Sequence, residues 1–428
     1  MADPHSSTDD GSLLIAGVGQ AGCQMAAAFW ARVCRDHQID PDTGHSESGP
    51  TGRWDRLFSL VGTGSRDERY VPRCLFVDSD PRTADELKRK WRELLNPANF
   101  VTGEESSGNN FAVAFREVND RLSSDIRDVL DREFRKPPAP TGFIVFQGFG
   151  GGSGSGLAAG LFEILKSYAP SAPILSVGVL PSSTVSTSVT EPYNSVFGIE
   201  AALRNVDLSL VFHNDLLLNL ASTHWEIENP SMEHIDGLIA DMVASITGPV
   251  RFDGQEQPAT PLGAVLNDLA PHPDFPLATG TIFPLQSILR KNASIRTSGQ
   301  ILNHVLEKNL DLCPCTEGTI LSLGLYGASR AGIPGYRTVN DAESTENEGI
   351  PHFAQLHLSA EPSPHSSICV VVNSSSIGQW LEELCDRFDQ LWERKAFANW
   401  YLDAGMTEAE IENLRREVGF RVDRYRDI

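Results

Sequence analysis

The chain has 428 residues, which is enough for two or three domains with a sizeable hydrophobic core. Hydrophobic residues make up 40% of it and charged residues 21%, as is ordinary for a soluble globular protein. The formal net charge of −22 argues against nucleic acid or an anionic membrane as the main partner, although an acidic surface also serves solubility alone.

The first half of the chain alternates apolar runs with amphipathic stretches. A strand is predicted at residues 13–18, followed by a helix from about Gly22 to Val33. Residues 36–69 are polar, with seven glycines or prolines, and indicate a long surface insertion. The elements predicted after it are a strand at 74–78, a helix at 113–134, a strand at 143–147, a helix that ends near 168 and a strand at 174–180. Strands that alternate with helices predict an α/β fold, with a parallel sheet wrapped by helices.

The second half begins with a long amphipathic helix. Apolar residues recur at helical spacing within residues 233–246, and we expect this helix to link two domains. Three apolar runs predict further strands of a second sheet, at residues 320–326, 353–358 and 368–372. An apolar stripe from Trp380 to Leu391 and a capping box at Thr407 and Glu410 predict two C-terminal helices.

The cysteines and the apolar runs indicate in which cellular compartment the protein is expected. Seven cysteines, odd in number and scattered, favour a reducing compartment over a disulfide framework. Residues 1–11 are polar and acidic, unlike a signal peptide, and no window approaches the ~18 apolar residues that a membrane span needs. We therefore expect a cytoplasmic protein with no membrane partner.

A glycine-rich stretch at residues 148–156 joins a predicted strand to a predicted helix. Bare backbone there can aim several N–H groups at phosphate oxygens, and the hydroxyls of Ser153 and Ser155 can donate as well. The chain has no Gly-Lys dipeptide, and neither serine has glycine on both sides at two residues' distance. The stretch is therefore neither a lysine-bearing phosphate loop nor a nucleophile elbow. A tight turn would need only two glycines, so the stretch predicts phosphate binding.

A second glycine motif follows the first predicted strand. Residues 17–22 match the dinucleotide fingerprint Gly-x-Gly-x-x-Gly, which is weak evidence alone. A nicotinamide enzyme should carry an acidic residue about 20 residues later, whereas Asp78 and Asp80 come more than 50 residues on. Two carboxylates at that place suit a magnesium–phosphate neighbourhood about as well. A nicotinamide-dependent oxidoreductase remains a minor alternative.

Several motifs together resemble the tubulin family, in the family's order. They are Gly19–Gln24, Tyr70–Arg73 with Phe76–Pro81, Asn109–Asn110, Gly150–Gly156, Val189–Asn194, His213–Asp215, Arg251–Gly254 and Arg394–Met406. The correspondence covers nearly the whole chain, and residues 96–99 and 395–402 resemble the A-type bacterial tubulins most closely. The resemblance implies a GTP-binding domain over residues 1–213, a linking helix, activating loop and second α/β domain over 214–378, and a C-terminal helical hairpin over 379–428.

The resemblance also implies a pocket for GTP or GDP with Mg²⁺. The residues on its phosphate side are Gly19, Gln20, Ala21 and Gln24 of the first loop, Asp78, Asp80 and Asn109, and Gly150, Gly151, Gly152, Ser153, Gly154 and Ser155. Asp80 and Asn109 fall on the γ-phosphate side. Gln20 and Asp80 are the implied neighbours of a magnesium ion held through the phosphates.

On the sugar and base side the implied contacts depart from the family pattern twice. Thr187 and Glu191 fall where the family holds the ribose, and Asn214 falls where an asparagine reads guanine. Met232 replaces a stacking tyrosine, so stacking on the base should weaken because methionine has no π-face. Asp236 replaces a second guanine-reading asparagine, and its carboxylate can accept from both N1–H and the exocyclic amine of guanine. A solvent-facing Asp236 is the alternative.

The largest departure concerns hydrolysis. Family members complete the active site across a subunit contact, with acidic residues of one subunit's loop near the next subunit's γ-phosphate. Here Pro261 and Ala264 fall at the places of those carboxylates, with Glu256 and Asp268 as substitutes at other offsets. Without a group to orient the water, we expect this subunit not to activate its neighbour.

The resemblance therefore implies a cytoskeletal GTP-binding protein that assembles head to tail into protofilaments, with itself or with a second tubulin. It implies a GTPase of tubulin type, although hydrolysis by this chain alone is doubtful. A tubulin-like regulator that binds GTP but caps or recruits filaments is the alternative.

Overall fold

The structure, a computed structural model, describes residues 11–62, 68–182, 188–252, 259–284, 319–328, 357–359 and 367–428, with the single positions 288, 291 and 304. Within these residues ten strands form one sheet. Their order across it is β11 (His357–Ser359), β10 (Ile320–Ala328), β12 (Ser367–Ser374), β9 (Leu277–Pro284), β8 (Leu208–His213), β7 (Ile174–Leu180), β6 (Pro140–Gly148), β1 (Ser12–Val18), β4 (Cys74–Asp78) and β5 (Phe100–Thr102).

The strands predicted as a second sheet do form, and they continue the first one. From β8 to β5 all neighbours are parallel, whereas β12 pairs antiparallel with both β9 and β10. The junction is short: Ser209 pairs with Leu277 and Leu210 with Ala278 in a parallel register between β8 and β9. Of the predicted run at 353–358, residues 353–356 lie outside the described residues, and β11 begins at His357.

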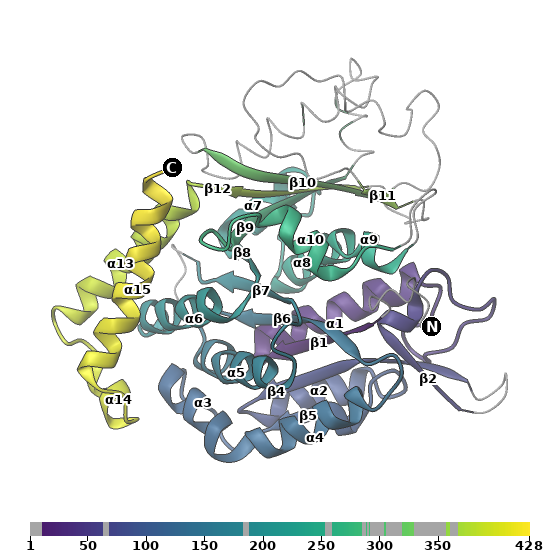
Figure 1. Ribbon diagram of the computed structural model, residues 1–428, viewed down its shortest axis with the longest axis horizontal. Helices are drawn as coiled ribbons and strands as arrows, with labels where there is room; N and C mark the ends of the chain where they lie inside the picture. The colour runs from purple at the N-terminus through teal and green to yellow at the C-terminus, as the bar shows by residue number, and fades with distance from the viewer. Residues whose placement is uncertain are drawn as a thin grey trace, which may run out of the picture.

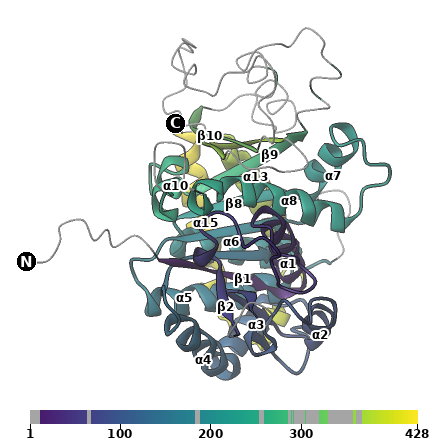
Figure 2. The same cartoon turned by 90° about the vertical axis from the view of Figure 1, so that its right-hand side faces the viewer.

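The helices cover both faces of the sheet (Figures 1 and 2). They are α1 (Gly19–Asp36), α2 (Pro81–Lys90), α3 (Phe111–Glu117), α4 (Ser123–Phe134), α5 (Ala158–Tyr168), α6 (Glu191–Asn205), α7 (Asn214–Thr223), α8 (Met232–Ile246), α9 (Gly248–Arg251), α10 (Leu262–Leu269), α13 (Ile377–Trp392), α14 (Ala398–Asp403) and α15 (Glu408–Arg426).

Alternate residues of the central strands enter two hydrophobic cores. Ile15 and Phe146 pack with α1 and α8 on one face, and Leu14 and Val145 pack with α3 to α6 on the other. The C-terminal helices α13 and α15 join the second core beyond α6, which places them on the outer side in Figure 1. A parallel sheet buried on both faces explains why its strands are continuous apolar runs.

Three features differ from the predictions. The helix predicted at 113–134 begins at Phe111 and is interrupted by a π-helical turn, Val118–Leu122. The structure also contains α2, α6 and β8, at residues for which no element was predicted. The insertion at 36–69 is partly core, because Leu57 and Phe58 are fully buried and a hairpin of β2 (Phe58–Val61) and β3 (Arg69–Pro72) forms there.

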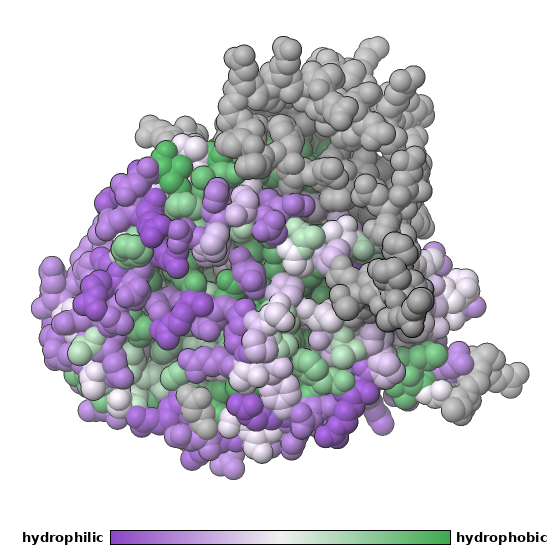
Figure 3. All heavy atoms as spheres, viewed as in Figure 1, coloured by the Kyte–Doolittle hydropathy of each residue, from purple (hydrophilic) through white to green (hydrophobic). Residues whose placement is uncertain are grey.

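Two further observations bear on the expected environment. The cysteines that the structure describes are buried thiols without a disulfide: Cys23, Cys34, Cys74, Cys369 and Cys385. Among the described helices, none combines the length and the apolar composition that crossing a bilayer requires. The face shown in Figure 3 mixes hydrophilic and hydrophobic residues.

Candidate functional site

The predicted phosphate-binding residues meet at one edge of the sheet. Val18 at the end of β1 lies in register with Val77 of β4 on one side and with Gln147 of β6 on the other. Because these strands are parallel, the segments that leave their carboxyl ends emerge together, which is the usual ligand position in open α/β sheets.

No loop separates β1 from α1, because the helix begins at Gly19, directly after the last residue of the strand. This glycine has a φ of +67°, and a Cβ on it would lie 2.6 Å from the backbone nitrogen of Gly154. A Cβ on Gly22 would lie 2.2 Å from the carbonyl oxygen of Phe146. The backbone therefore requires both glycines. Gln20 is exposed in the first helical turn, where N–H groups have no intrahelical partner, and Ala21 and Gln24 are half-buried beside it.

The glycine-rich stretch is more ordered than a loop. A π-helical turn, Ser153–Leu157, leads into α5. A Cβ on Gly152 would lie 2.2 Å from the backbone nitrogen of Asn110, and one on Gly154 would lie 2.5 Å from the carbonyl oxygen of Gly148. Gly151 differs, because the nearest atom to its Cβ position, Asn109 Oδ1, is 3.8 Å away. Gly151 thus leaves open space where Gly152 and Gly154 allow close packing.

The two serine hydroxyls of this stretch have different partners. Ser155 is buried and donates to the carbonyl oxygen of Gly151 at 2.6 Å. Ser153 Oγ lies 3.0 Å from Ser107 Oγ and also bonds to Ser79 Oγ. Sequence reasoning missed Ser79 and Ser107, since single serines in loops carry no distinguishing pattern. Together the three hydroxyls connect the ends of β4 and β6 with the segment that precedes α3.

The two aspartates after β4 have opposite environments. Asp78 is buried at the strand end, and burial raises the pKa of its carboxyl. Asp80 caps α2 by accepting from the Arg82 N–H at 2.9 Å, and hydrogen bonds from the Arg82 side chain and backbone lower the pKa of Asp80. Over the part of the chain that the structure describes, no three His, Cys, Asp or Glu side chains gather as a metal site. Gln20 and Asp80 would therefore hold Mg²⁺ only together with phosphate oxygens.

Asn109 connects the segment before α3 to the glycine-rich stretch. Its φ is +55°, in the left-handed region, and its Oδ1 accepts from the Gly152 N–H at 2.8 Å. Its carbonyl oxygen accepts from Thr190 Oγ1 at 3.1 Å and from Asn194 Nδ2 at 3.0 Å. Buried groups thus fix the backbone of Asn109 from the side of α6.

The residues predicted for the ribose and the base lie at helix starts. Glu191 is the first residue of α6 and is buried, and Thr187 lies outside the described residues. Asn214 begins α7, and its Oδ1 is buried without a hydrogen-bond partner. Met232 begins α8 and is 50% exposed. Asp236, one turn further along α8, is half-buried, and burial followed by repulsion from Glu233 raises its pKa to about 7.

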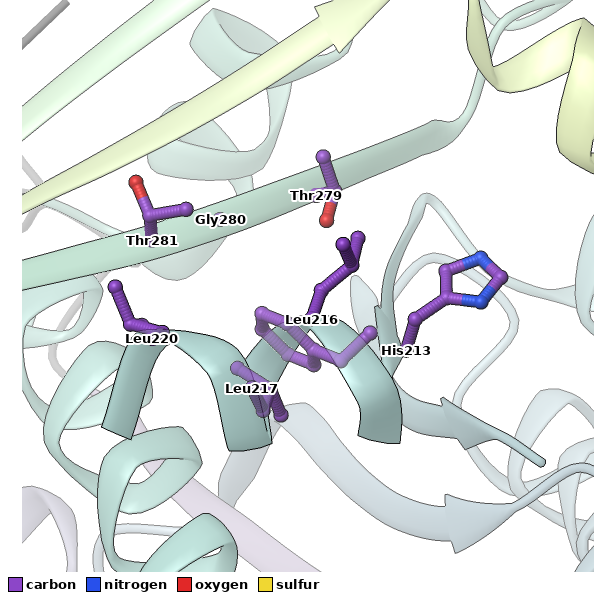
Figure 4. A pocket seen from close by; sticks show the side chains of 8 residues that line it. His213, Leu216, Leu217, Leu220, Thr279, Gly280 and Thr281 are labelled. Carbon is purple, nitrogen blue, oxygen red and sulfur yellow. The ribbon is translucent and has the colours of Figure 1, made fainter. Parts of the chain in front are cut away.

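A small cavity between α7 and β9 is a separate feature (Figure 4). Its volume is about 20 Å³, and Figure 4 shows Leu216, Leu217 and Leu220 of α7 opposite residues 279–281 of β9, with the His213 ring at one end. That volume fits about one water molecule. A nucleotide base cannot enter a cavity of that size.

The positions of the family's hydrolytic carboxylates, Pro261 and Ala264, and the substitute Asp268 lie at the opposite edge of the sheet. Pro261 precedes α10, and Ala264 and Asp268 share the exposed face of that helix, one turn apart. Leu262 of α10 lies against Gly142, near the start of β6, whereas the glycine-rich stretch follows the end of β6. From Gly142 to Gly148 the strand rises about 20 Å at ~3.3 Å per residue. Glu256 lies outside the described residues.

Comparison with known proteins shows which family the sequence resembles. A family model described as "Tubulin/FtsZ family, GTPase domain" matches residues 12–222. The "Tubulin alpha chain" of Pneumocystis carinii is 29% identical, with 96% of this chain and 95% of the relative covered. The "Tubulin alpha-2 chain" of Schizosaccharomyces pombe and that of Caenorhabditis elegans are each 28% identical, with the same coverage.

The matched segment contains all the phosphate-side residues predicted above. It also contains the fingerprint at residues 17–22, which leaves the nicotinamide alternative without support. The relatives named are fungal and nematode proteins, so the particular resemblance to the A-type bacterial tubulins stays a prediction.

Proposed function

Because the chain belongs to the tubulin/FtsZ superfamily, we propose that it binds GTP at this sheet edge and assembles head to tail into cytoskeletal protofilaments. The partner is a second copy of the chain or a second tubulin, in the cytoplasm. GTP hydrolysis is completed across the contact between subunits. The observation that carries the proposal is the convergence of Gly19, Asn109 and Gly151 at one edge, with the exposed face of α10 at the other.

The glycine edge fits a triphosphate. Residues 19–22 form the first turn of α1 and supply N–H groups without an intrahelical partner, and the open space at Gly151 is where a Cβ would obstruct an oxygen atom. Gln20 and Asp80 would hold Mg²⁺, which neutralises phosphate charge when it is bound. Asn109 and Asp78 complete the γ-phosphate side, while Glu191 and Thr187 hold the ribose.

Two polar groups that have no hydrogen-bond partner among the described residues support guanine over adenine. Asn214 Oδ1 is buried and unbonded, and the half-buried Asp236 carboxylate has no hydrogen bond to any described residue. A carboxylate accepts from N1–H and from the exocyclic amine of guanine, whereas adenine presents a lone pair at N1. The half-exposed Met232 covers the base by apolar contact.

The position of α10 supports hydrolysis between subunits rather than within one. Ala264 and Asp268 are exposed at the far edge, about 20 Å of strand from their own glycine-rich stretch. They can approach a phosphate only in the pocket of the next subunit. Pro261 and Ala264 offer that pocket no group to orient water, so the chain alone hydrolyses GTP slowly, and Asp268 is the carboxylate of α10 nearest to those positions.

Sedimentation tests the proposal against the regulator alternative. The full chain is incubated with Mg²⁺ and GTP, GDP or ATP, with and without a second tubulin, and the pellet is analysed by electron microscopy. GTP-dependent protofilaments support the proposal. A chain that binds GTP yet neither pellets nor copolymerises is a regulator instead. A chain that does not bind GTP contradicts both functions.

A further inference from the structure

The side chain of Asn194, in the first turns of α6, joins both phosphate segments to the C-terminal helices. Its Nδ2 donates to the carbonyl oxygens of Asn109 at 3.0 Å and Gly150 at 2.9 Å. Its Oδ1 accepts from the Phe111 N–H at 3.0 Å and from the Tyr401 hydroxyl at 2.8 Å. Two donors and two acceptor positions are the full capacity of an amide, so only one orientation of this side chain satisfies all four partners.

The Asn194 amide bonds to a backbone position with an uncommon conformation. Asn109 is in the left-handed region, at a φ of +55°, and its Oδ1 in turn receives the Gly152 N–H. Asn194 is fully buried, and buried hydrogen bonds of this kind are costly to leave unmade. Asn194 thereby fixes the distance between the Asn109 and Gly150 backbones, which flank the open position of Gly151.

The fourth partner of this amide comes from a different layer of the fold. Tyr401 lies on α14, is fully buried, and places its hydroxyl 3.5 Å from the Thr190 carbonyl as well. A second contact runs the same way, because Asn110 Nδ2 donates to the Trp400 carbonyl oxygen at 2.9 Å. In Figure 1 α14 belongs to the C-terminal layer outside α6. That layer therefore contacts the segment before α3 directly at Asn110 and indirectly through Asn194 of α6.

We propose that Asn194 and Tyr401 are positioning residues of the GTP site, through which α14 sets the arrangement of the two phosphate segments. This inference rests on the proposed function. Asn109 is on the γ-phosphate side, so a correctly oriented Asn194 favours GTP over GDP. By linkage, GTP that prefers this arrangement stabilises the docked position of α14 to the same extent.

The test compares two buried tyrosines whose hydroxyls have different hydrogen-bond partners. Tyr401→Phe removes the hydroxyl that orients Asn194. Tyr193→Phe is the matched control, because the Tyr193 hydroxyl donates to the Ala396 carbonyl at 2.9 Å and so joins α6 to the C-terminal segment without touching a phosphate segment. Affinities for GTP and GDP are measured for both variants and the wild-type chain, with thermal unfolding as the check on folding.

Tyr401→Phe should weaken GTP binding about threefold to tenfold and GDP binding less, so that the preference for GTP falls. Tyr193→Phe should keep the wild-type preference for GTP over GDP, even if it lowers the unfolding temperature as much as Tyr401→Phe does. A wild-type preference in folded Tyr401→Phe overturns the inference and leaves the proposed function intact. A wild-type chain that binds neither nucleotide contradicts the proposed function, and the inference with it.

Hydrogen exchange of the wild-type chain gives a second readout that needs no variant. GTP binding should slow exchange of the α14 amides, residues 398–403, more than GDP binding does. Protection confined to residues 19–24, 106–111 and 148–156 would overturn the inference, even if Tyr401→Phe failed to fold.

Discussion

Gly19 and Gly154 touch across the site: a Cβ on Gly19 would lie 2.6 Å from the Gly154 backbone nitrogen. The first turn of α1 and the glycine-rich stretch are therefore packed against each other before any ligand arrives. Some glycines at this edge allow close packing of backbones and Gly151 leaves open space, which we propose for phosphate oxygens, and substitutions can separate the two roles.

Gly151→Val should abolish GTP binding and leave the fold largely intact, because the nearest atom to its Cβ position is 3.8 Å away, an ordinary contact distance, and the new side chain would occupy the proposed phosphate position. Gly152→Val should destabilise the protein, since its Cβ would lie 2.2 Å from the Asn110 nitrogen. Thermal unfolding and GTP titration of both variants check this. Normal GTP binding by Gly151→Val would show that the stretch is only a turn.

Asp236 should make GTP binding depend on pH. Its pKa in the folded chain is raised to about 7, and the proposed guanine contact needs the carboxylate. GTP affinity should therefore fall below pH 7, by up to about tenfold per pH unit. Asp236→Ala should cost about 1–3 kcal/mol of GTP binding, remove this pH dependence and reduce the preference for GTP over ATP. If ATP competed within a few-fold in the wild-type chain, the guanine role of Asp236 would be wrong.

The same carboxylate should affect the stability of the nucleotide-free chain. A carboxyl group whose pKa is raised on folding binds more protons folded than unfolded between pH 3.8 and about 7, so its contribution to stability declines as pH rises through that window. Asp236→Asn removes the buried charge and should raise the free energy of unfolding above pH 7. Denaturant titrations of both proteins at pH 5 and pH 8 measure this. An equal difference at both pH values would contradict it.

Ala264→Glu should accelerate hydrolysis in filaments of this chain alone. The residue is exposed in the first turn of α10, where a glutamate is compatible with the helix and its dipole. A group that orients water can raise the rate by ~10²-fold or more, measured as phosphate release from pelleted polymer. Ala264→Gln is the control for size. A wild-type polymer that already hydrolyses at the rate of Ala264→Glu would point to Asp268 or Glu256, and Asp268→Asn distinguishes these two.

Elements with a strong local pattern were predictable, and contacts between distant segments were not. The strands at 13–18 and 174–180 and the helix at 233–246 follow from apolar runs and periodicity, and the structure confirms them. The pairing of β8 with β9 joins Ser209 to Leu277, and no local pattern specifies such a register. The buried Leu57 and Phe58 were missed because polar neighbours and glycines dominate that insertion.

The site shows the same division. Glycine motifs marked the segments that meet at the proposed phosphate side, because a Cβ on Gly19, Gly152 or Gly154 would collide with neighbouring backbone. No local sequence pattern marked the hydrogen bonds of Asn194, since its partners lie 85 residues away at Asn109 and 207 residues away at Tyr401. Asn in a helix otherwise reads as an ordinary polar residue.

A reconstruction by electron microscopy of polymer grown from the full chain with GTP and Mg²⁺ tests the central claim most directly. We predict protofilaments in which nucleotide lies between the glycine-rich stretch of one subunit and the exposed face of α10 of the next. Filaments whose α10 faces solvent or a lateral neighbour, with the nucleotide away from any subunit contact, would contradict the account.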